Sequence, residues 1–140
     1  MNTAPRDDLT EEDWVYTPER VRDFEDAVAA RGHTMLTVVA REVATGELAA
    51  FNQVVVHPEW PDVVENEDTA VAVPHRGRGL GRWVKALNVL RVLDETPARV
   101  ISTWNAASNG HMLRVNRELG FACQHVWESW EVSLSEAEAP

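Results

Sequence analysis

The 140-residue chain contains one cysteine and one tyrosine, and none of its apolar runs approaches the ~18 residues that a membrane span needs. A single thiol excludes an internal disulfide framework and a multi-cysteine zinc cluster. The amino terminus, MNTAPRDDLTEEDW, is acidic, whereas a secretory signal begins with basic residues followed by apolar ones. We therefore expect a cytoplasmic protein with no membrane partner.

The chain also has fewer basic than acidic residues: 13 Lys and Arg against 23 Asp and Glu give a formal charge of −10. They are concentrated between Thr69 and Arg117, where eight basic and two acidic residues give this segment +6 and leave −16 for the remainder. A mostly acidic chain repels a polyanion, so we expect no nucleic-acid partner. The basic segment could still bind one compact anion.

The composition, with 44% hydrophobic and 26% charged residues, is typical of a globular protein. We expect an acidic arm over residues 1–16, a single folded domain over 17–134 and a frayed tail over 135–140. Apolar spacing and turn residues predict an α/β or α+β fold in which helices flank a sheet. The predicted elements are a helix from Thr17 to Gly32, a hairpin of Thr34–Val43 and Leu48–His57, a strand from Val64 to Val73, a helix from Leu80 to about Asp94, a strand over Arg99–Thr103, a helix over Asn109–Leu119 and a long strand over Phe121–Leu134.

The segment Arg76-Gly77-Arg78-Gly79-Leu80-Gly81-Arg82 places three alternating glycines between a predicted strand and a predicted helix. The first turn of a helix has unpaired N–H donors and a partial positive charge, and glycines let a phosphate approach the main chain. The segment therefore predicts a phosphate site. It has neither the Gly-Lys-Ser/Thr of a Walker loop nor the spacing of a dinucleotide fingerprint. The alternative is a solvated, glycine-rich surface turn.

The same segment fits the Arg/Gln-x-x-Gly-x-Gly/Ala motif and resembles the GNAT superfamily of acyl-CoA N-acyltransferases. The run from Trp104-Asn105 through Asn109 to Leu119-Gly120-Phe121 is similar to the second cofactor segment of that family. Thr69-x-Val71 and Lys85 further resemble the carboxy-terminal halves of tandem acetyltransferases of the mycothiol synthase type. The resemblance implies a mixed, mostly antiparallel central sheet flanked by helices, with acetyl-CoA as the cosubstrate.

The resemblance also implies where acetyl-CoA binds, namely where the strand ending at Val73 separates from the strand at residues 100–103. Main-chain groups of Val71 and Val73 would pair with the pantetheine, and Asn105 and Asn109 would reach the pantetheine or the phosphates. The pyrophosphate would be held by the N–H groups of Arg76, Gly77, Arg78, Gly79, Leu80, Gly81 and Arg82.

Acetyl transfer to an amine needs a base, for which Glu65 is our first candidate and Glu67 our second. Strand alternation places both on one face, and the alternative is that they belong to a solvated acidic rim. The N–H of Val71 is the candidate oxyanion donor implied by the resemblance. We expect no metal, because His33, His57 and His125 share no metal-like spacing.

Two departures from the family pattern keep a second interpretation open. Asn116 occupies the position where many members have a tyrosine that protonates the leaving thiolate, and the family's first strand and helix and its last strand have no clear counterpart. The leading interpretation is an N-acetyltransferase in which the amine of a small molecule attacks acetyl-CoA directly. The alternative is a non-catalytic acyl-CoA-binding or interaction module, a degenerate half-domain. Either would pair with a second copy, as a homodimer, or with a second GNAT-like domain.

Overall fold

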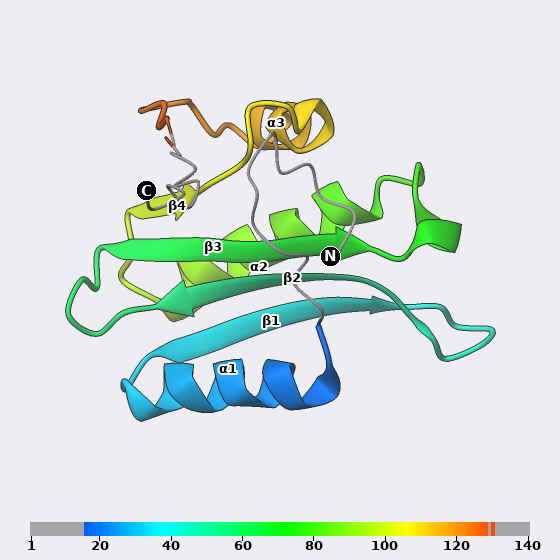
Figure 1. The fold of residues 1–140 in the computed structure, drawn as a ribbon, viewed down its shortest axis with the longest axis horizontal. Helices are drawn as coiled ribbons and strands as arrows, with labels where there is room; N and C mark the ends of the chain where they lie inside the picture. The colour runs from blue at the N-terminus through cyan, green and yellow to red at the C-terminus, as the bar shows by residue number, and fades with distance from the viewer. Residues whose placement is uncertain (1–15, 129, 131–140) are drawn as a thin grey trace, which may run out of the picture.

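The computed structural model describes residues 16–128 and residue 130. Its core is a four-stranded sheet, with one long helix packed across a face of the sheet (Figure 1). In chain order the elements are α1 (Pro18–Ala30), β1 (Thr34–Arg41), β2 (Leu48–Val56), β3 (Val63–Val71), the short 3-10 helix η1 (Val73–His75), α2 (Leu80–Glu95), β4 (Val100–Thr103) and α3 (Gly110–Glu118).

The sheet has the strand order β1-β2-β3-β4. The first three strands form an antiparallel meander, and β4 pairs with β3 in parallel after the crossover through α2. In Figure 1, α1 lies along β1 at one edge of the sheet and α3 lies beyond β4 at the other. The predicted mixed, mostly antiparallel sheet flanked by helices is therefore confirmed.

The hydrophobic core lies between α2 and the sheet, because the helix and three strands each present an apolar face there. Val84 packs with Ala40 and Ala50. Further along α2, Val92 packs with Val54 and Val64. Fully burying a valine contributes about 1.5–3 kcal/mol. These contacts hold α2 across the strands and so place its amino terminus beside the end of β3.

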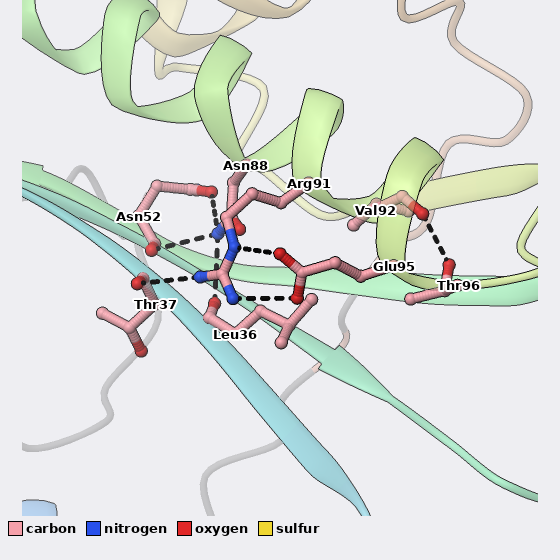
Figure 2. Close-up of polar contacts among 8 residues, drawn as sticks. All are labelled: Leu36, Thr37, Asn52, Asn88, Arg91, Val92, Glu95 and Thr96. Atoms are coloured by element: carbon pink, nitrogen blue, oxygen red, sulfur yellow. Dashed lines mark hydrogen bonds and ion pairs between the residues drawn. The ribbon is translucent and has the colours of Figure 1, made fainter.

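A buried amide network fixes the position of α2 over β2 (Figure 2). The side-chain nitrogen of Asn88 donates to Oδ1 of Asn52 at 2.9 Å and to the carbonyl of Leu36 at 3.1 Å. Asn52 in turn donates to Oδ1 of Asn66 at 2.9 Å. Because Asn52 and Asn88 are fully buried, any sliding of α2 would leave polar groups unpaired, at about 1–3 kcal/mol for each group.

The long strand predicted over Phe121–Leu134 is wrong for the residues that the structure describes, since residues 121–128 form neither strand nor helix. A strand needs a neighbour for its N–H and C=O groups, and the edge strand β4 is only four residues long. Residue 129 and residues 131–134 lie outside the described residues. The predicted strand to Val73 ends at Val71 instead, because Pro74 and the turn of η1 follow.

The predicted helix from Thr17 is confirmed, and its Thr17 hydroxyl accepts the N–H of Arg20 at 3.3 Å as an amino-terminal cap. Of the predicted arm over residues 1–16 only Tyr16 is described, and the tail over residues 135–140 lies outside the described residues. The domain boundaries therefore stay predictions. Among the helices of the described segment, each is too short or too polar to cross a membrane.

Candidate functional site

Strands β3 and β4 pair over four positions only and then separate. Their register runs from Val63 opposite Val100 to Asn66 opposite Thr103, where the Thr103 hydroxyl donates to the carbonyl of Asn66 at 3.1 Å. Beyond this point β3 continues to Val71, while the chain after β4 turns toward α3. Within the described residues, the last five positions of β3 therefore have no strand partner on the β4 side.

Val71 presents its main-chain groups to this gap. Val71 lies opposite Ala50 of β2, and the next residue, Ala72, donates its N–H to the carbonyl of Ala49 at 2.9 Å. Residues of an antiparallel strand alternate between bonding their neighbour and facing away from it, so the N–H and C=O of Val71 point away from β2. The Nε of Arg76 donates to that carbonyl at 3.1 Å, which leaves the N–H as the group of Val71 that faces the gap.

The three glycines of the loop are needed for two different reasons. Gly77 and Gly79 have φ of 74° and 77°, in the left-handed region that side chains with a Cβ rarely adopt. Gly81 is needed for space, because a Cβ there would lie 3.3 Å from Cγ2 of Val71. The loop thus turns sharply and brings the first turn of α2 into direct contact with the last residue of β3.

The first turn of α2 leaves main-chain donors available. Gly79 is the amino-terminal cap residue and has no side chain to accept these N–H groups, so the structure gives no side-chain cap. Two arginines of the loop contact neighbouring groups: Arg78 lies 3.4 Å from Nδ1 of His75, and Arg82 forms an ion pair with Glu118 of α3 at 2.9 Å. The guanidinium of Arg82 is therefore compensated, whereas its N–H belongs to the exposed end of the helix.

A chain of hydrogen bonds connects α2 to the end of β4 through α3. The Lys85 ammonium donates to Oδ1 of Asn116 at 2.7 Å, and Nδ2 of Asn116 donates to Oδ1 of Asn105 at 2.6 Å. Lys85 is only 1% exposed, and its Nζ lies 4.7 Å from the centre of the Phe121 ring. This burial lowers the pKa of Lys85 to about 8.

Sequence reasoning did not assign a role to Lys85 or to its hydrogen bonds, although a signal is present. Lys85 and Asn88 occupy the same helical stripe as Val84 and Val92, a stripe that is otherwise apolar and faces the core. Asn109, by contrast, lies where the sequence predicts, and its Oδ1 caps α3 by accepting the N–H of Met112 at 3.1 Å. Val73 and Leu80 flank the loop, at the start of η1 and at the start of α2.

The carboxylates of β3 lie on both sides of the point where the strands separate. Glu65 lies before it, opposite Ser102 of β4, and its Oε2 is 3.0 Å from Nε2 of His57. Glu67 and Asp68 lie after it, at a β-bulge where the pairing register with β2 shifts. Burial, with the nearby charges of Glu65 and Asp68, raises the pKa of Glu67, and burial raises that of Asp68.

Comparisons with known proteins agree with this geometry. No family model and no curated protein sequence matches the chain. Among solved structures, a tandem GNAT protein from the clavulanic acid biosynthesis pathway is 34% identical with a TM-score of 0.70, and the match covers 73% of this chain and 32% of that one. The chain therefore spans about a third of the length of that tandem protein.

Two further solved structures are alike in fold at lower identity. An acetyltransferase of Trypanosoma brucei is 17% identical with a TM-score of 0.64, over 87% of this chain and 84% of that one. A glucosamine-6-phosphate N-acetyltransferase from Arabidopsis thaliana is 18% identical with a TM-score of 0.59, over 82% and 78%. The chain therefore has the fold of the GNAT superfamily.

Proposed function

We propose that this chain is an acetyl-CoA-dependent N-acetyltransferase that acts on the amine of a small molecule. The observation that supports this most is the separation of β3 from β4 directly beside the glycine loop and the amino terminus of α2. Bound acetyl-CoA would supply the acetyl group as a thioester. The tandem GNAT protein and the named acetyltransferases with the same fold support acyl transfer as the chemistry.

The residues around the gap fit an acyl-CoA. The absence of a Cβ at Gly77, Gly79 and Gly81 leaves main-chain N–H groups accessible, and the N–H of Val71 extends the same donor surface along β3. Arg76 and Arg78 add positive charge beside the loop. The loop and the first turn of α2 would hold the pyrophosphate, and the main chain of Val71 would meet the pantetheine amides as an added strand does.

Glu67 is the better-placed of the two candidate bases, in the reverse of the order expected from sequence. Glu65 lies where the strands are still paired and contacts His57, whereas Glu67 is the first residue past the separation. The reaction forms an amide N–C bond, breaks the C–S bond and releases the CoA thiol. Glu67 would take the proton that the attacking ammonium loses, and its raised pKa makes it a better proton acceptor than an ordinary carboxylate.

Lys85 supplies the positive charge that the departing thiolate needs. Its chain of hydrogen bonds through Asn116 ends at Asn105, the second residue after β4. The two side-chain amides carry no proton from Lys85, so this chain of hydrogen bonds offers charge stabilisation only. The departing CoA thiolate, whose thiol has a pKa of ~8.5, would take its proton from water.

Calorimetric titration of acetyl-CoA tests the binding site. Gly79→Glu would place a carboxylate in the loop, and Gly32→Glu is its matched control, because Gly32 has nearly the same φ, 75°, and lies just before β1 at the opposite end of the sheet from Val71. Both variants place the same charge at a glycine of nearly the same φ. We expect Gly79→Glu to weaken acetyl-CoA binding at least tenfold and Gly32→Glu to leave it unchanged. Equal affinities for the two variants would remove the loop from the proposed site.

One observation favours the alternative of a non-catalytic acyl-CoA-binding module. Both ends of the Asn116 amide are engaged by Lys85 and Asn105, and an amide cannot itself donate a proton to a thiolate. Release of free thiol from acetyl-CoA across a panel of small amines separates the two functions. Release that Glu67→Gln abolishes and Glu25→Gln, an exposed substitution on α1, preserves would establish the enzyme. Binding of acetyl-CoA without release by any amine would establish the module.

We infer the kind of amine that the chain accepts from the charge of the chain. The −16 charge outside the basic segment would attract a cationic amine.

Because the chain spans about a third of a tandem GNAT protein, we further propose that it pairs with a second copy or a second GNAT-like domain. Light scattering of the purified chain tests the homodimer, and a monomer at micromolar concentration would exclude it.

A further inference from the structure

Two histidines and two glutamates meet at the end of the sheet where β1 begins and β2 ends. His33 immediately precedes β1, and the register of the hairpin, Thr34 opposite Val56, brings it next to His57 at the end of β2. Glu59 follows in the turn to β3, and Glu65 lies on β3 itself. The cluster is thus assembled by strand pairing from residues that are distant in sequence, which is why their spacing shows no metal motif.

The distances within this cluster suit a common ligand. The His33 and His57 rings lie 4.3 Å apart between their centres, and Nε2 of His33 is 3.5 Å from a carboxylate oxygen of Glu59. One donor atom from each of these three residues lies within 4.8 Å of the others. Two ligands bound to one tetrahedral zinc ion at about 2.0–2.1 Å are about 3.3 Å apart, so small side-chain rotations would complete the geometry.

Burial distinguishes the three groups in a way that favours metal binding. The side chains of His33 and His57 are only 13% and 12% exposed, so their rings are held by packing before any ion arrives. The side chain of Glu59 is 58% exposed, which leaves an approach from solvent. With neutral imidazoles the three groups carry a net charge of −1, and a divalent cation would compensate it.

Glu65 gives the cluster a supporting carboxylate. Its Oε2 lies 3.0 Å from Nε2 of His57. Metal-binding histidines usually donate their second ring N–H to such a group, which fixes the ring and raises its basicity. Glu65 therefore has a positioning role for His57.

We propose that His33, His57 and Glu59 form a binding site for a divalent transition metal ion of the zinc class, with Glu65 orienting His57 and one coordination position open to water. Two imidazoles and a carboxylate are a donor set suited to Zn²⁺ and its neighbours. The proposal departs from the expectation, based on sequence spacing, that the protein binds no metal. It is independent of the proposed acetyltransferase function.

Titration of the metal-free protein with ZnCl₂ by calorimetry tests the site. We expect one Zn²⁺ per chain with a Kd of micromolar or tighter, and a rise in Tm on saturation. The double variant His33→Gln/His57→Gln should bind at least 100-fold more weakly, whereas His125→Gln, at an exposed position outside the cluster, should bind as the parent does. No measurable heat, or equal binding by the parent and the double variant, would overturn the proposal.

A second variant is needed because the two histidines are largely buried, and replacing both could unfold the protein. Glu59→Gln changes an exposed side chain and should leave the circular dichroism spectrum unchanged while weakening Zn²⁺ binding at least tenfold. Glu25→Gln, at an exposed position of α1, is its control and should not change the affinity. A folded Glu59→Gln protein with the affinity of the parent would rule out Glu59 as a ligand and with it the proposed three-residue site.

Discussion

Replacing Lys85 by methionine should change how stability depends on pH. Lys85 is 1% exposed and its ammonium is bonded to Asn116, in a position that lowers its pKa from the ordinary 10.5 to about 8. The unfolded chain therefore binds this proton more tightly than the folded one. Below pH 8 the buried charge destabilises the folded state, and the penalty disappears as pH rises from about 8 to 10.5.

The magnitude follows from the two pKa values. Their difference corresponds to about 3.5 kcal/mol of unfolding free energy, at about 1.4 kcal/mol for each tenfold change in proton affinity. Methionine removes this penalty but leaves Oδ1 of the buried Asn116 without its donor, which costs about 1–3 kcal/mol. At pH 7 the two effects oppose one another, so the variant should be about as stable as the parent. At pH 10 most of the penalty has disappeared, so the lost hydrogen bond decides the difference and the variant should be the less stable.

Urea denaturation of both proteins at pH 7, 8, 9 and 10 measures this. Other groups that titrate in this range are common to both proteins and cancel in the difference. We expect the difference in unfolding free energy to shift by about 2–3 kcal/mol in favour of the parent between pH 7 and 10. A difference that is constant with pH would show that Lys85 keeps an ordinary pKa in the folded protein.

Three further outcomes test other parts of the structure. Asn52→Ala should lower the unfolding free energy in urea by about 3 kcal/mol, because it removes the donor to Oδ1 of buried Asn66 and one acceptor of Nδ2 of buried Asn88, and a loss below about 1 kcal/mol would contradict the network. Gly81→Val should cost about 1–3 kcal/mol by overpacking against Val71, measured in the same way, and an unchanged stability would show that the contact relaxes freely. Glu67→Gln should raise Tm at pH 7, since its carboxylate is less favourable in the folded state, and this gain should vanish as pH falls to about 4, where the parent is protonated; a gain that persists in acid would contradict the raised pKa.

Features set by local chemistry could be predicted from the sequence. Thr17 and Asn109 are short polar residues that accept main-chain N–H groups, and both cap helices where their positions indicate. The glycine loop was recognisable for the same reason, since Gly77 and Gly79 adopt backbone angles that few other residues tolerate. The GNAT resemblance depended on this loop, and so the fold could be predicted as well.

Features set by tertiary contacts could not be predicted. Residues 121–128 can pair as a strand only if β4 is long enough to be their neighbour. The alternation of apolar residues within 121–128 contains no information about the length of β4. The contact of His33 with His57 depends on the hairpin register, and the bond from Lys85 to Asn116 depends on how α3 packs against α2. The preference for Glu67 over Glu65 required the exact position at which β3 and β4 separate.

The two links between α2 and α3 respond differently to the solvent. The Arg82–Glu118 ion pair is exposed, so dissolved salt weakens it in part, while the Lys85–Asn116 bond is shielded by burial. High ionic strength therefore loosens the surface contact between the two helices and leaves the buried contact in place.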